Sequence, residues 1–212
     1  MAHRVGFWSA VCAAVFSLAY VVAQLFEWTG ILGSHGGPNS PSTPLGLAVI
    51  LTPSLLLGPA FLVMVAALYE TAPQDRRVFT LVGLVFATVY TTLNCAIYFG
   101  QLTFVAPRLA LGQTSDIQVL LFIPYRSFLF AIDLLGYSFM SLSTLFAGFG
   151  LCPRRRLTRV ALIGNGALAP ALGLQMFFPA LIWVGSLWAV TFPTSAILVA
   201  RLFAAPPTEP AS

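Results

Sequence analysis

Long runs of apolar residues alternate with short polar segments along most of the chain. A helix needs about 20 residues to cross the hydrocarbon core of a bilayer, and four of the runs reach that length. A fifth stretch, over residues 160–202, is long enough for two shorter helices with a turn at 175–179. The pattern predicts an all-α, polytopic transmembrane bundle of six helices, over Val5–Phe26, Leu45–Tyr69, Val78–Phe104, Ser127–Leu151, Val160–Leu174 and Ala180–Leu202.

The composition supports a membrane protein and excludes other classes. Hydrophobic residues make up 58% of the 212 residues and charged residues only 8%, whereas about a quarter of a soluble domain is charged. So little charge cannot cover a water-facing surface, which excludes a soluble domain. We expect a single transmembrane six-helix domain over residues 1–203. A short disordered cytoplasmic tail is expected over residues 204–212 (AAPPTEPAS).

The basic residues predict the orientation of the bundle. All ten are arginines in a chain of net charge +4, and they lie mainly in short loops, as membrane orientation requires and nucleic-acid binding does not. The lack of lysine is typical of a GC-rich bacterial source, so we expect the bacterial plasma (inner) membrane. With both termini inside, the inner side holds eight arginines and the outer side only Arg108 and Arg126. The inner set is Arg4, Arg76, Arg77, Arg154, Arg155, Arg156, Arg159 and Arg201.

Two functions are open for the arginine cluster after the fourth predicted helix. Arg154, Arg155, Arg156 and Arg159 are expected to act as topology determinants. Binding of an anionic lipid headgroup is the alternative.

Asp133 is the most informative polar residue, because it lies inside the fourth predicted helix. A carboxylate at that depth costs free energy unless it is paired or hydrogen-bonded, and an intramembrane acid is a functional candidate. The residues of the neighbouring helices that match its depth predict an outward-facing polar pocket, with Glu27 at its rim. The alternative is that these groups only hydrogen-bond between helices. The candidate ligand-binding residues are Asp133, Tyr137, Asn94, Tyr98, Gln101, Tyr20 and Gln24.

No metal, cofactor or catalytic constellation is predicted. The three cysteines form no CxxC pair, and His3 and His35 lie outside the apolar runs, which argues against zinc and haem. A paired-carboxylate site needs a second buried acid beside Asp133, and none is expected.

The layout of six spans, the Pro153-Arg154 loop after the fourth helix and the following Gly164 resemble bacterial six-helix integral membrane families of unknown function. This resemblance implies a fold and no activity.

Three functions are therefore considered. The first is a membrane protein that binds or transports a small solute or lipid in the pocket around Asp133. The second is a structural or assembly subunit of a membrane complex. The third is a lipid-acting membrane enzyme with Asp133 as general acid or base. The expected partners are the lipid bilayer, the solute or lipid ligand, and a second copy of the chain or another membrane subunit; no nucleic acid is expected.

Overall fold

The computed structural model describes residues 1–205, and these residues form helices and connecting turns with no strand. Residues 206–212, most of the predicted tail, lie outside the described residues. Five helices are long and apolar enough to cross a membrane, which confirms the all-α, membrane-type architecture. They are Ala2–Trp28, Pro44–Glu70, Gln74–Ala110, Phe128–Gly150 and Pro179–Ala204.

Three of these five are single helices, α1 (Ala2–Trp28), α2 (Pro44–Glu70) and α5 (Phe128–Gly150). The other two are composite. The first joins the 3-10 turn η1 (Gln74–Arg76), α3 (Arg77–Gly100), the π-helical turn η2 (Gln101–Val105) and α4 (Ala106–Ala110). The second joins η4 (Pro179–Leu181), α8 (Ile182–Gly185) and α9 (Trp188–Ala204). Between α4 and α5 lies the 3-10 helix η3 (Ser115–Leu120).

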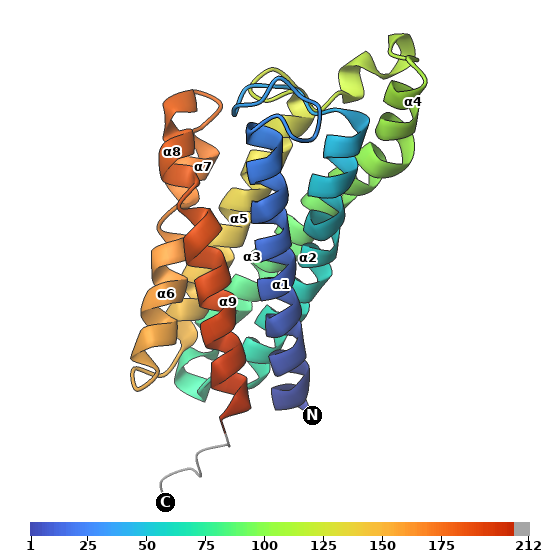
Figure 1. Ribbon diagram of the computed structural model, residues 1–212. Helices are drawn as coiled ribbons and strands as arrows, with labels where there is room; N and C mark the ends of the chain where they lie inside the picture. Colours follow the sequence, from blue (N-terminus) through green and yellow to red (C-terminus); the bar gives the residue numbers. More distant parts are fainter. Residues whose placement is uncertain (206–212) are drawn as a thin grey trace, which may run out of the picture.

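The predicted helix over Val160–Leu174 is not one continuous helix. It is divided into α6 (Arg156–Gly166) and α7 (Ala169–Gly173), neither of which alone has the length of a span. Pro170, in the first turn of α7, has no N–H to donate to the carbonyl of Gly166, so the hydrogen-bond ladder stops there. Figure 1 shows α6 and α7 following one another along the bundle, with α8 and α9 returning beside them.

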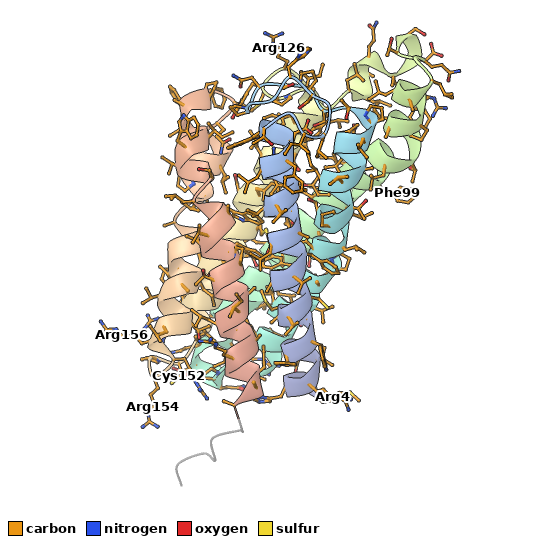
Figure 2. All side chains as sticks on the ribbon, viewed as in Figure 1. Arg4, Phe99, Arg126, Cys152, Arg154 and Arg156 are labelled. Atoms are coloured by element: carbon orange, nitrogen blue, oxygen red, sulfur yellow. The ribbon has the colours of Figure 1, made fainter. Side chains whose placement is uncertain are left out.

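The start of α1 and the end of α9 meet at one end of the bundle, called here the end with the termini (Figure 1). The ring of His3 in α1 lies 5.7 Å from that of Phe203 in α9. Gly6 allows this approach, because a Cβ there would lie 2.6 Å from the Phe203 ring. Figure 2 places Arg4, Arg154 and Arg156 at this end and Arg126 at the opposite end.

Proline removes a backbone hydrogen bond from α2, and side chains of α3 donate to α2 carbonyls in its place. Pro59 cannot donate to the carbonyl of Leu55, one turn earlier. The thiol of Cys95 in α3 donates to that carbonyl at 3.6 Å. A second side chain of α3 acts in the same way: the Thr91 hydroxyl donates to the carbonyl of Gly58, the residue before Pro59, at 3.1 Å. In a membrane interior, where water is absent, such substitutes keep an interrupted helix stable.

Small residues let α3 pack closely along α5. The hydroxyl of Ser143 in α5 donates to the carbonyl of Gly83 in α3 at 2.7 Å. A Cβ on Gly83 would lie 2.9 Å from the Ser143 carbonyl oxygen and 3.2 Å from the Ala147 nitrogen. Both neighbours are backbone atoms of a helix, so they cannot move aside independently. Close backbone approach at small residues is a usual way for membrane helices to associate.

We therefore expect Gly83→Ala to lower the free energy of unfolding by about 1–3 kcal/mol, because α3 and α5 must separate to admit the methyl group. The matched control is Gly164→Ala in α6, where a Cβ has no neighbour within 4 Å. That substitution should leave stability unchanged or raise it by up to about 1 kcal/mol, through helix propensity. Unfolding of both variants in the same detergent measures the difference, and equal losses would contradict this account of the interface.

Candidate functional site

The Asp133 carboxylate is held by two side chains of α3. Its Oδ1 accepts a hydrogen bond from the Tyr98 hydroxyl at 2.5 Å and one from the Asn94 Nδ2 at 2.8 Å. Asn94 and Tyr98 are four residues apart, which puts them one above the other on one helix face. All three residues are buried, Asp133 with 7% of its surface exposed. Asn94 and Tyr98 therefore lie at the level of Asp133, as their positions in the sequence predict.

Gly136 makes room for this arrangement. It lies one turn below Asp133 on α5, and a Cβ there would overlap the Asn94 amide. The amide can lie against the α5 backbone only because position 136 has no side chain. The Asn94 Nδ2 also lies 3.5 Å from the Asp133 carbonyl oxygen, so it donates to both the side chain and the backbone of Asp133.

A cavity of about 400 Å³ lies on the other side of Asp133. Its walls come from the second half of α1, the first turns of α2, the start of α5, α7, α8 and the start of α9, with the α1–α2 loop across it. These elements meet at the end of the bundle away from the termini (Figure 1). The polar and aromatic lining residues are Tyr20, Gln24, Glu27, Trp28, Ser40, Ser42, Phe122, Phe130, Asp133, Tyr137, Gln175, Ser186 and Trp188.

The seven residues predicted from the sequence fall into three groups. Asp133, Tyr137, Tyr20 and Gln24 line the cavity. Asn94 and Tyr98 contact Asp133 from behind and are not part of the lining. The third group is Gln101 alone, whose amide turns away and donates to the carbonyl of Leu120 at 2.7 Å. Gln101 thus ties the π-helical turn at the end of α3 to η3.

Glu27 is the residue that the sequence interpretation misplaces. It was expected at the rim, but it is only 2% exposed and lines the same cavity as Asp133. Neither of its carboxylate oxygens has a hydrogen-bond partner within residues 1–205. The expectation that Asp133 has no second buried acid is therefore wrong.

Two neighbours explain the burial of Glu27. The first is the start of α2, because a Cβ on Gly46 would lie 2.6 Å from the Glu27 Oε2. A carboxylate is favoured there by the helix dipole. The second is the α1–α2 loop, which folds back so that the Gly37 N–H donates to the Trp28 carbonyl at 2.9 Å. Gly36 and Gly37 have φ values of +75° and +77°, so this path depends on glycine.

Three aromatic rings meet where the cavity is deepest in the bundle. The ring of Tyr137 lies 5.2 Å from that of Trp188 and 6.3 Å from that of Tyr20, and Tyr20 and Trp188 are 5.7 Å apart. The Trp188 Nε1 is buried and has no hydrogen-bond partner in the described part of the chain. The cavity is therefore lined by three aromatic rings and two acidic residues, of which Asp133 alone has a carboxylate oxygen that is not fully covered.

The described residues give no support for a metal centre, since no three His, Cys, Asp or Glu side chains among them come together as ligands. Comparison of the chain with protein-family models, curated proteins and solved structures finds no match. The resemblance to bacterial six-helix families stays an expectation.

Two tyrosines of α3 test the energetic importance of the Asp133 contact. Tyr98 and Tyr90 are both fully buried, but the Tyr98 hydroxyl binds Asp133, whereas the Tyr90 hydroxyl has no partner among the described residues. We expect Tyr98→Phe to lower the free energy of unfolding by about 1–3 kcal/mol, because it leaves a buried carboxylate short of a donor. Tyr90→Phe should be neutral or stabilising. Thermal unfolding of both variants measures this, and similar losses would refute the assigned role of Tyr98.

Proposed function

We propose that this is a multi-pass membrane protein that binds a small solute in the cavity around Asp133, as a binding protein or transporter. One observation carries the proposal. Asp133 Oδ1 accepts two hydrogen bonds, but Oδ2 accepts none from residues 1–205 and is not fully covered, while Asp133 lines the cavity. A buried acid with one oxygen fixed and the other turned to a cavity is arranged for a ligand.

The orientation is part of the proposal. The α6–α7 pair is taken as one broken crossing, which gives six crossings and puts both termini on one side of the membrane. Eight of ten arginines lie in segments at the end with the termini, and the positive-inside rule makes that end cytoplasmic. In this orientation the cavity faces outward. The arginine cluster after α5 then determines topology and contacts anionic headgroups; it consists of Arg154, Arg155, Arg156 and Arg159.

The cavity favours solute binding over the alternative of a structural or assembly subunit. A subunit that only packs against partners needs close-packed helices and no internal space. Here about 400 Å³ is left open beside a carboxylate, within the size range of small-molecule sites.

Thiol accessibility tests both the cavity and the orientation. In a background in which Cys12 and Cys152 are alanine and Cys95 is serine, which keeps a donor for the Leu55 carbonyl, the Ser186→Cys variant places a thiol in the cavity wall. In sealed cells we expect it to react with a small membrane-impermeant thiosulfonate added outside, because the cavity admits water and small solutes. Labelling followed by mass spectrometry of the intact protein measures the extent of reaction.

Two other positions serve as controls for this experiment. Ser195→Cys is matched, because Ser195 and Ser186 each bond back to a helix carbonyl, but Ser195 is fully buried and outside the cavity. It should stay unlabelled from both sides. Arg154→Cys should react only from the inner side. An unreactive Ser186→Cys thiol would overturn the accessible cavity, and reaction from the same side as Arg154→Cys would overturn the orientation.

A further inference from the structure

The lining of the cavity is unbalanced in charge. Glu27 and Asp133 both contribute carboxylates, and no arginine or histidine is among the described residues that form the wall. The only ion pairs between side chains within residues 1–205 are Arg76–Asp75 and Arg77–Glu70, both at the end with the termini. Arg126, the arginine nearest in sequence to Asp133, lies at the same end of the bundle as the cavity (Figure 2), but it is exposed and is not among the lining residues.

Two buried carboxylates without a cationic partner are costly, because the loss of hydration is not offset by an ion pair. Tyr98 and Asn94 satisfy only one of the four carboxylate oxygens. The start of α2 favours Glu27 through its dipole but donates no hydrogen bond to it. A cation in the cavity can donate to the Asp133 Oδ2, which is not fully covered, and its charge offsets that of both carboxylates.

The aromatic residues match the same demand. Tyr20, Tyr137 and Trp188 line the cavity, and the negative electrostatic potential of aromatic π systems attracts ammonium groups. Tyr20, Gln24 and Glu27 share one face of α1, and the seven-residue step from Tyr20 to Glu27 spans about 10 Å along the helix. The site is thus long enough for a ligand with an apolar body beside its charged group. Anions are disfavoured by both carboxylates.

We infer that the cavity binds an organic cation, an amine or quaternary ammonium with an apolar body, which Asp133 and Glu27 hold by charge and the Tyr20, Tyr137 and Trp188 rings hold by cation–π contact. This inference rests on the proposed solute-binding function and adds the class of ligand. In this arrangement Asp133 contacts the cation through its open oxygen, and Glu27, whose oxygens are covered, adds attraction through its charge.

Charged thiol reagents of similar size test the sign of the cavity. In the Ser186→Cys variant, reaction rates are compared for a thiosulfonate that carries trimethylammonium and one that carries sulfonate, each normalised to its rate with a free thiol in solution. We expect the cationic reagent to be favoured by at least about tenfold, because charge is screened less inside a protein cavity than in bulk water and two acidic residues line this one. Asp133→Asn and Glu27→Gln should each reduce that preference, and the double variant should abolish it.

The matched control is Asp116→Asn. Asp116 is an exposed acid in η3 and is not part of the cavity lining, so its loss should leave the preference unchanged. If Asp133→Asn fails to fold, the preference with both acids present and its reduction in Glu27→Gln still decide the question.

A ligand series with one body and three head groups tests binding itself. Phenylbutylamine, phenylbutanol and phenylbutyrate are compared as protectants of the Ser186→Cys thiol against an uncharged thiol reagent. We expect the amine to protect at a concentration at least about tenfold lower than the alcohol, the carboxylate to give no protection, and Asp133→Asn to remove the advantage of the amine. Nanodiscs of phosphatidylcholine and of phosphatidylglycerol then separate a lipid ammonium headgroup from a free amine, since only the first would protect without added ligand.

The outcomes separate the two proposals. A thiol that reacts with every reagent at solution-like ratios, or that phenylbutyrate protects as well as the amine, overturns the organic-cation inference and leaves the cavity standing. A thiol that reacts with none of the reagents overturns the proposed function as well.

Discussion

The half of the bundle away from the termini depends on the hydrogen bonds that Tyr98 and Asn94 donate to the Asp133 carboxylate. A carboxylate inside a membrane helix is unfavourable unless donors are placed in advance. Here the donors come from the facing helix, and the depth of Asp133 therefore determines how α3 and α5 align along their length. Gly136 and Gly83 allow the two backbones to approach closely enough for the bonds to form. In this pair of helices, close backbone packing is therefore needed for the buried carboxylate to receive its hydrogen bonds.

The two halves of the bundle differ in how they use polar groups. In the half near the termini, Asn165 joins α5, α6 and α9 by accepting from Thr191 at 2.8 Å and donating to Thr144 at 2.9 Å. Both of its amide atoms are satisfied, so this cluster functions well as a link between helices. In the opposite half, Glu27, one oxygen of Asp133 and the Trp188 N–H are left without partners among the described residues and adjoin a cavity. Asn165 thus has the bonding of a structural link, whereas the open oxygen of Asp133 beside a cavity supports the proposed ligand site.

Two short helices form part of the cavity wall. α7 and α8 line it through Leu172 and Gly185, and the turn between them lines it through Gln175. A Cβ on Gly185 would overlap the Gln175 amide. Irregular backbone at membrane depth is tolerated where it is buried in protein or borders a cavity. The predicted fifth helix is divided near Pro170, and the segment that follows the division, α7, borders the cavity.

Apolar runs and residue spacing predicted the five long helices and one half of the candidate site. Long apolar runs can only be stable as hydrogen-bonded helices in lipid, and the four-residue step from Asn94 to Tyr98, at the depth of Asp133, predicts their meeting. Two results needed the tertiary structure. Pro170 was visible, but whether a proline bends or divides a helix depends on its neighbours. Glu27 was visible as well, but the burial of a residue at a helix end depends on the path of the next loop, and here positive-φ glycines and Gly46 bring that loop and α2 over it. Apolar periodicity carries no information about such a path, because it reports which face of a helix is covered and not what folds across its end.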